Sequence, residues 1–195
     1  MKPLLDLKKS NEELPQPTFE AFPKIPRLMR EIVITEKIDG TNACIHVAEN
    51  GTVLAGSRSR WIMPEDDNFG FARWVKTNEE ALRTGLGFGT HYGEWWGAGI
   101  QRRYGLTEKR FSLFNTTRWT DETRPSLCHS TPEIYRGPFS YEWITRALEL
   151  LRTQGSYAAP GFMKPEGVVI FHSSSNALYK VTIEKDEEPK GTPRS

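Results

Sequence analysis

The sequence predicts an α+β domain in which antiparallel sheets are flanked by a few helices. The clearest sign of antiparallel strands is a hairpin pattern, in which Glu49-Asn50-Gly51 separates the β-type runs 43–48 and 52–57. Asn-Gly is the pair that two-residue hairpin turns favour. The clearest helical pattern covers 141–153. Strand patterns outnumber helical patterns along the chain, so we expect a strand-rich architecture.

One further strand pattern precedes this hairpin, and two short helical patterns follow it. An apolar run makes 31–37 a predicted strand. Asn68 is expected to cap a helix that runs toward Lys76, and a second short helix over 79–83 is expected to end at Gly85.

The second half of the chain combines further strands with the longer helix. Within 141–153, Ile144, Leu148 and Leu151 recur at helical spacing, and Gly155 follows as a stop signal. The remaining predicted strands are 90–95, 110–115, 167–172 and 177–183.

The chain of 195 residues is long enough for one domain with a sizeable core. Residues 1–30 carry five prolines and scattered charges, so we expect an irregular lead-in. The domain itself is expected to cover 31–183. The segment 184–195 is charged and holds two prolines, which predicts a disordered tail.

Composition narrows the class of protein. The 26 Lys and Arg nearly balance the 25 Asp and Glu, which excludes a basic field over the whole molecule as the basis of nucleic-acid binding. The two cysteines, Cys44 and Cys128, do not make a disulfide framework and fit a reducing compartment. No run approaches the roughly 18 apolar residues of a membrane span. We therefore expect a cytoplasmic protein that does not bind membranes.

Residues 36–42, Glu-Lys-Ile-Asp-Gly-Thr-Asn, are the most informative segment. They place Lys37 at the end of a β-type run and before a tight turn. A free lysine has a pKa of about 10.4, so its amine needs nearby positive charge or burial before it can attack a phosphate. The same pattern also fits an ordinary surface turn, in which Asp39 and Gly40 have only a structural role. The distinction depends on the rest of the chain.

Five further segments follow Lys37 in order. They are Ser57-Arg58-Ser59-Arg60, Tyr92-Gly93-Glu94-Trp95, Arg110-Phe111-Ser112-Leu113-Phe114, Pro165-Glu166-Gly167-Val168-Val169-Ile170 and Tyr179-Lys180-Val181. With 36–42, this series resembles the covalent nucleotidyltransferase superfamily of ATP-dependent DNA ligases, RNA ligases and mRNA capping enzymes. The form of the first segment is most similar to RNA ligases of the phage type 2 kind. The resemblance covers 31–183.

The resemblance implies a role for each residue around the reacting phosphate. Lys37 would attack the α-phosphate of ATP, and Glu166 would bind the catalytic metal, which suits a carboxylate because hard cations prefer oxygen ligands. Glu36 would lie against the adenine and help select it, while Asn42 would support the phosphate site. The alternative for Glu166 is an exposed glutamate at a strand end.

The resemblance also implies residues that hold the nucleotide. Arg58 would bind phosphate and Glu94 the ribose hydroxyls, with structural ion pairs as the alternative for both. Phe111 would stack on the adenine, unless its ring belongs to the core. Strand alternation places Lys180 opposite Tyr179 and Val181, and the resemblance makes it a ligand of the α-phosphate.

The resulting expectation is an ATP-dependent RNA ligase with a ligase-like and capping-enzyme-like domain and no C-terminal OB domain. It would use ATP and Mg²⁺ or Mn²⁺, form a lysyl-AMP intermediate, and seal 5′-phosphate to 3′-hydroxyl ends of RNA, in the host cytoplasm if a phage encodes it. The alternatives are a DNA ligase, a GTP-using capping-type enzyme, and a degenerate nucleotide- or nucleic-acid-binding module. The last is favoured by Leu178 or Thr182 standing where relatives carry a second lysine beside Lys180. The oligomeric state is left open.

Overall fold

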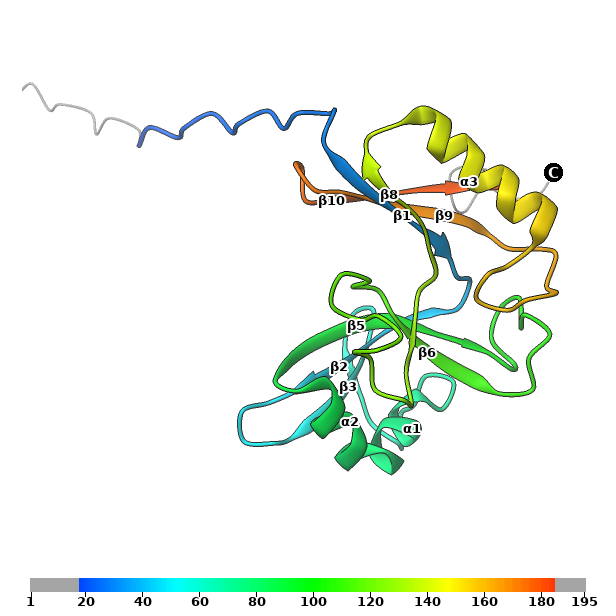
Figure 1. The fold of residues 1–195 in the computed structure, drawn as a ribbon. Helices are drawn as coiled ribbons and strands as arrows, with labels where there is room; N and C mark the ends of the chain where they lie inside the picture. Colours follow the sequence, from blue (N-terminus) through cyan, green and yellow to red (C-terminus); the bar gives the residue numbers. More distant parts are fainter. Residues whose placement is uncertain (1–17, 185–195) are drawn as a thin grey trace, which may run out of the picture.

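The computed structural model describes residues 18–184, which contain two β-sheets and three α-helices (Figure 1). The four-stranded sheet has the order β10-β9-β1-β8, with β1 (Glu31–Lys37), β8 (Glu133–Pro138), β9 (Gly167–His172) and β10 (Ala177–Thr182). The six-stranded sheet has the order β4-β3-β2-β5-β6-β7, with β2 (Thr41–Val47), β3 (Val53–Ser57), β4 (Trp61–Ile62), β5 (Gly89–Gly97), β6 (Lys109–Leu113) and β7 (His129–Ser130). The helices are α1 (Phe71–Thr77), α2 (Glu79–Leu86) and α3 (Tyr141–Gln154).

The predicted α+β class with antiparallel sheets is confirmed. Of the paired strands in residues 18–184, β6 and β7 alone run parallel. The predicted hairpin is β2–β3, the predicted strand 31–37 is β1, and the predicted helix 141–153 is α3, which ends at Gly155.

The two sheets lie between two helical layers. Figure 1 shows α3 on the outer face of the four-stranded sheet, and α1 and α2 on the outer face of the six-stranded sheet. On β1, Ile32 and Ile34 pack with Leu151 of α3, whereas on β2 Ile45 lies in a second core cluster with Phe71 of α1. Each such buried side chain contributes about 1.5–3 kcal/mol. Because side chains alternate along a strand, the faces that the two sheets turn toward each other carry the residues between these core positions.

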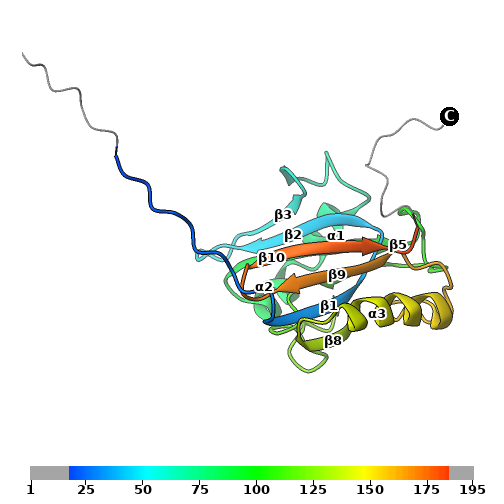
Figure 2. The ribbon, with the colours of Figure 1, turned by 90° about the horizontal axis from the view of Figure 1, so that it is seen from above.

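The chain crosses from one sheet to the other at residues 38–40, between β1 and β2, and at 131–132, between β7 and β8. Figure 2 shows the four-stranded sheet from above, in its order from β10 to β8. Lys37 is the last residue of β1. It therefore lies where the two sheets meet.

The predicted cap of the first helix is wrong. Asn68 does not cap α1; its side-chain amide donates to Thr41 Oγ1 at 3.0 Å. The neighbouring carboxylate does the work of a cap, since Asp67 Oδ1 accepts from the backbone N–H of Ala72 at 2.8 Å. A carboxylate at a helix start also interacts favourably with the helix dipole. The sequence signal was thus one residue away from the group that stabilises the turn.

Two further elements differ from expectation. Helix α2 continues through Gly85 and ends at Gly87, whose φ of +68° suits a residue without a side chain. Strand β8 carries little sequence signal, because its segment ends in Arg136-Gly137-Pro138 and it pairs only with β1 at the sheet edge.

Residues 18–30 contain neither helix nor strand. Residues 1–17 of the predicted lead-in and 185–195 of the predicted tail lie outside the described residues. In the described part of the chain, no helix combines the length and the apolar character that crossing a bilayer requires.

Candidate active site

Lys37 and Glu166 meet where β1 leaves the four-stranded sheet. Glu166 directly precedes β9, whose first residue, Gly167, pairs with Lys37 in the antiparallel register. Lys37 Nζ lies 2.5 Å from Glu166 Oε2, and the two side chains are 20% and 13% exposed. Two residues 129 positions apart in the sequence thus form a largely buried ion pair.

Gly167 allows β9 to begin directly after Glu166. Its φ is +152°, and a Cβ atom there would lie 2.2 Å from the backbone oxygen of Val181 in β10. No other residue fits this close approach of two strands. The pairing of β9 with β10 therefore fixes the position from which the Glu166 carboxylate reaches Lys37.

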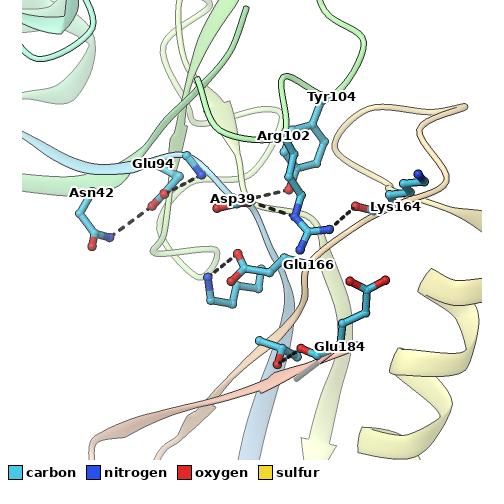
Figure 3. A network of polar contacts seen from close by, with 11 residues as sticks. Asp39, Asn42, Glu94, Arg102, Tyr104, Lys164, Glu166 and Glu184 are labelled. Atoms are coloured by element: carbon cyan, nitrogen blue, oxygen red, sulfur yellow. Dashed lines mark hydrogen bonds and ion pairs between the residues drawn. The ribbon is translucent and has the colours of Figure 1, made fainter. Parts of the chain in front are cut away.

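The turn after Lys37 is held by groups from the six-stranded sheet and from the loop between β5 and β6 (Figure 3). Arg102 Nε donates to Asp39 Oδ2 at 2.9 Å, and the backbone N–H of Asp39 donates to Tyr104 Oη at 2.7 Å. A Cβ atom on Gly40 would lie 2.5 Å from the backbone oxygen of Trp95, so this position requires glycine. Asp39 therefore shapes the turn, and the turn fixes the backbone that follows Lys37.

Glu94 connects β5 to the same turn. Its carboxylate accepts from the backbone N–H of Gly40 at 3.0 Å and from Asn42 Nδ2 at 3.2 Å (Figure 3). Burial raises the pKa of Glu94 to about 7, against the lowering effects of the Gly40 hydrogen bond and the Lys37 charge. The predicted residues Lys37, Asn42, Glu94 and Glu166 are thus brought together.

The raised pKa of Glu94 predicts a pH-dependent stability. Between pH 4.5 and about 7 the unfolded chain loses this proton while the folded protein keeps it, so the free energy of unfolding falls as the pH rises. A Glu94→Gln variant lacks this ionisation, and its carbonyl oxygen can still accept from Gly40. We expect it to exceed the wild type in unfolding free energy by on the order of 3 kcal/mol at pH 8, and by much less at pH 5. Thermal unfolding at both pH values measures this, and an equal difference at both would contradict it.

Lys180 lies on the same face of the four-stranded sheet as Lys37. Lys180 pairs with Val169, which pairs with Thr35, two residues before Lys37 on the same side of β1. The expected alternation within β10 is confirmed, because Tyr179 and Val181 lie on the other face. The side chain of Lys180 is exposed and has no acidic partner among residues 18–184. It is therefore a cation open toward the space between the sheets.

The strand register shows which of Leu178 and Thr182 lies nearer to Lys37. Thr182 pairs with Gly167, which pairs with Lys37, whereas Leu178 lies four residues before Thr182 along β10 and pairs with Phe171. Thr182 thus occupies the nearer position, where its hydroxyl donates to the backbone oxygen of Glu184 at 2.9 Å.

Arg58 directly follows β3, whose last residue, Ser57, pairs with Ala43. This register places Arg58 at the level of Asn42. The Arg58 side chain is exposed and has no ion-pair partner in the described part of the chain, whereas Arg60 binds Asp66. Of the two arginines, Arg58 is therefore the one available to a ligand.

Glu36 points away from Lys37, as neighbours on a strand do. Its buried carboxylate accepts from Ser156 Oγ at 2.6 Å and from the backbone N–H groups of Tyr157 at 2.8 Å and Ala158 at 2.9 Å. Burial also raises the pKa of this carboxyl. Glu36 therefore anchors the loop between α3 and β9, and its contact with adenine stays a prediction.

Phe111 lies in the core. Its ring is 0% exposed and packs against Phe71 and Trp74 on the helix side of the six-stranded sheet. Ser112 pairs with Glu94, so Ser112 lies on the inner face and Phe111 on the opposite one. Two residues after Ser112, Phe114 returns to the inner face and is 42% exposed. In this structure Phe114, and not Phe111, offers a ring to the space between the sheets.

A cleft of about 810 Å³ lies beside this site without containing it. Its lining includes Ser112, Thr131 and Tyr157 but none of Lys37, Glu94 and Glu166. We therefore define the site by its converging charged and polar groups and not by the cleft.

Sequence reasoning missed the groups that support the site. Arg102 and Tyr104 contact Asp39 from 63 and 65 positions away, and Ser156 contacts Glu36 from 120 positions away. No local spacing indicates such contacts. They depend on the loops that join strands, which pattern analysis does not place.

Comparison with known proteins identifies a matching family model, described as RNA ligase, over residues 30–182. A comparison with curated proteins gives no match.

Several solved structures of a Naegleria gruberi RNA ligase share the fold. An alanine variant with ATP and Mn has a TM-score of 0.58 and 16% identity, and the match covers 82% of this chain and 53% of that one. A second variant, with AMP and Mn, has a TM-score of 0.57 and 17% identity and covers 89% and 60%. A third, without ligand, has a TM-score of 0.57 and 16% identity and also covers 89% and 60%. The present chain thus spans little more than half the length of these ligases.

Proposed function

The chain belongs to the RNA ligase family, and we propose that it is an ATP-dependent RNA ligase in which Lys37 accepts AMP. Lys37 Nζ attacks the α-phosphorus of ATP, a nitrogen–phosphorus bond forms, and pyrophosphate leaves. An oxygen of the 5′-phosphate at an RNA end then attacks the phosphorus of the bound AMP, the nitrogen–phosphorus bond breaks, and the amine of Lys37 is released. A 3′-hydroxyl attacks that 5′-phosphorus, and AMP leaves as the strand is sealed.

The observation that carries this proposal is the contact of Lys37 Nζ with Glu166 Oε2 at 2.5 Å, on a rigid strand end. A nucleophile must be held within reach of one phosphorus atom, and rigid elements hold groups more closely than loops do. Lys37 is fixed from both sides, by β9 through Gly167 and by the turn that Glu94 and Arg102 hold. A solvated turn lysine would need none of these contacts.

Glu166 fits a divalent cation bound together with substrate. Among residues 18–184, no group of three His, Cys, Asp or Glu side chains is arranged to hold a metal alone. Mg²⁺ binds in such sites through one or two carboxylates together with substrate phosphates and water. A Mg²⁺ or Mn²⁺ ion on Glu166 would compete with its ion pair to Lys37, favour the neutral amine and offset charge on the phosphate oxygens.

The facing sheets would hold the nucleotide. Arg58 and Lys180 supply cations for the phosphates, and the Asn42–Glu94 pair supplies hydrogen-bonding groups for the ribose and the phosphate site. We assign the adenine ring to Phe114, with Val169 of β9 on the facing sheet. Stacking on an aromatic ring accepts any base, so selection of adenine over guanine depends on other contacts.

The two phenylalanines of this region should behave differently on substitution. Phe111→Ala removes a core ring and should lower the free energy of unfolding by about 3–5 kcal/mol. Phe114→Ala should change it by less than about 1 kcal/mol and raise the KM for ATP roughly tenfold. Thermal unfolding and ATP-dependent labelling measure the two effects. If Phe114→Ala were unstable and Phe111→Ala were impaired only in ATP use, the ring that stacks on adenine would be Phe111 and not Phe114.

A strand-sealing assay tests the proposed function. The protein is incubated with Mg²⁺, with ATP or GTP, and with RNA or DNA that carries 5′-phosphate and 3′-hydroxyl ends. We expect ATP-dependent joining of RNA. Joining of DNA alone would indicate a DNA ligase, and covalent labelling by GTP alone a capping-type enzyme. Binding of nucleotide without labelling would indicate a non-catalytic module, for which Thr182 in place of a lysine would be an explanation.

A further inference from the structure

Three exposed aromatic rings lie in one row across the inner face of the six-stranded sheet. Trp61 pairs with Gly56, Gly56 with Cys44, and Cys44 with Tyr92. Phe114 extends the row, because its backbone N–H donates to the oxygen of Tyr92. Along β2 and β5 this row lies two residues from the pair Asn42–Glu94. Its side chains therefore point to the same face of the sheet as the proposed active site.

The rings of this row are open to solvent. Trp61 is 52% exposed and Tyr92 is 63% exposed, and neither belongs to a core cluster of the described residues. Exposed aromatic side chains that gather on one face of a protein frequently mark a binding surface.

The indole of Trp61 lies close to the sheet because residue 56 is a glycine. A Cβ atom on Gly56 would lie 3.1 Å from two ring atoms of Trp61 and 2.5 Å from Cys44 Sγ. The absence of a side chain at Gly56 therefore makes room for the indole over β3. His46 of β2, on the far side of β3, also contacts the indole, with the ring centroids 5.9 Å apart. One side of the indole thus packs on the sheet while the rest remains accessible.

The position of Trp61 suits a strand that leaves the proposed active site. Neighbouring strands are about 4.8 Å apart, so Trp61, three strands from Tyr92, lies roughly 14 Å beyond it. Arg58 lies near the same strand end as this row and has no ion-pair partner among residues 18–184. A guanidinium next to exposed rings is the combination that binds the phosphates and bases of single-stranded nucleic acid.

We propose that Trp61 is a stacking platform for an unpaired base of the RNA strand, a few nucleotides from the end that is joined. This inference rests on the proposed function, since the substrate strand is what connects Trp61 to Lys37. It makes Trp61 a residue of RNA binding and not of AMP acceptance.

The test compares Trp61→Ala and Trp61→Phe with Phe88→Ala, which removes an exposed ring from the loop before β5, outside the row. Two quantities are measured: the Kd for a 5′-phosphorylated single-stranded RNA, by fluorescence anisotropy without ATP, and the rate of covalent labelling by ATP without RNA. We expect Trp61→Ala to weaken RNA binding roughly tenfold and to label at the wild-type rate. Trp61→Phe and Phe88→Ala should bind RNA as the wild type does.

Each other outcome overturns the inference. Equal RNA binding by Trp61→Ala and the wild type would show that the ring contacts no base. If the wild type binds no RNA, the exposed rings would bind another partner, such as a protein. Slower labelling by Trp61→Ala in proportion to its weaker RNA binding would assign the ring to the fold or the nucleotide. Labelling of the wild type is read separately, so failure of the proposed function is distinguished from failure of the platform.

Discussion

A Lys37→Ala variant is expected to form no covalent adduct with ATP and to seal no RNA. The amine is the group to which AMP would be transferred, and among residues 18–184 Lys37 is the lysine whose side chain contacts Glu166. Loss of a nucleophile removes most of an enzyme's acceleration, so we expect labelling to fall by more than about a thousandfold. Labelling with α-labelled ATP on a denaturing gel measures it.

Two companion variants separate chemistry from charge. Lys37→Arg keeps a cation next to Glu166 but has no nucleophilic amine, so it should also fail to label. Lys164→Ala removes an exposed lysine side chain near the same turn. The contact of Lys164 with Arg102, at 3.0 Å, is made by the backbone oxygen of Lys164 and is kept in this variant (Figure 3). Lys164→Ala should label normally. Wild-type labelling by Lys37→Ala would remove Lys37 from the reaction.

Glu166→Gln is the second substitution with a large expected effect. The amide has almost the shape of the carboxylate but is a poor ligand for Mg²⁺, and it carries no charge for Lys37. Labelling by ATP should fall by about a hundredfold or more at a fixed Mg²⁺ concentration. If Glu166 acts through a cation, a higher Mn²⁺ concentration should restore part of the loss.

The matched control for this carboxylate is Glu184→Gln. Glu184 is exposed beyond β10, close to the same strand ends, and its backbone oxygen accepts from Thr182. Its carboxylate has no ion pair with any residue of the described range 18–184. It should label at the wild-type rate. A loss in Glu166→Gln that is independent of metal concentration would instead make Glu166 a positioning residue for the Lys37 amine. Labelling by Glu166→Gln at the wild-type rate at every metal concentration would contradict both roles.

Much of the strand framework is predictable because its signals are local. The hairpin with Asn50-Gly51 in its turn, the apolar run of β1 and the alternation in β10 depend on neighbouring residues, and the structure reproduces all three. Strand β8 is not predictable in this way, because its half-buried residues gain their strand conformation from pairing with β1.

The site shows the same limit. The order of the segments indicates that Lys37, Glu94 and Glu166 belong together, but the contacts between them depend on strand register. Register also decides which face each of the two phenylalanines occupies. Because Ser112 pairs with Glu94 on the inner face, Phe111 lies on the opposite face, in the core, whereas Phe114 lies on the inner face. A single sequence shows that both rings are present. It does not show the strand pairing, which decides which ring faces the site.

The position of the adenylate on the protein tests directly whether Lys37 is the nucleophile. The wild type is incubated with Mg²⁺ and ATP and digested, and the modified peptide is sequenced by mass spectrometry. We expect the added mass of one AMP on Lys37, linked through an acid-labile phosphoramidate and removed when pyrophosphate is added. An adenylate on another residue, or bound ATP without any adenylate, would contradict it.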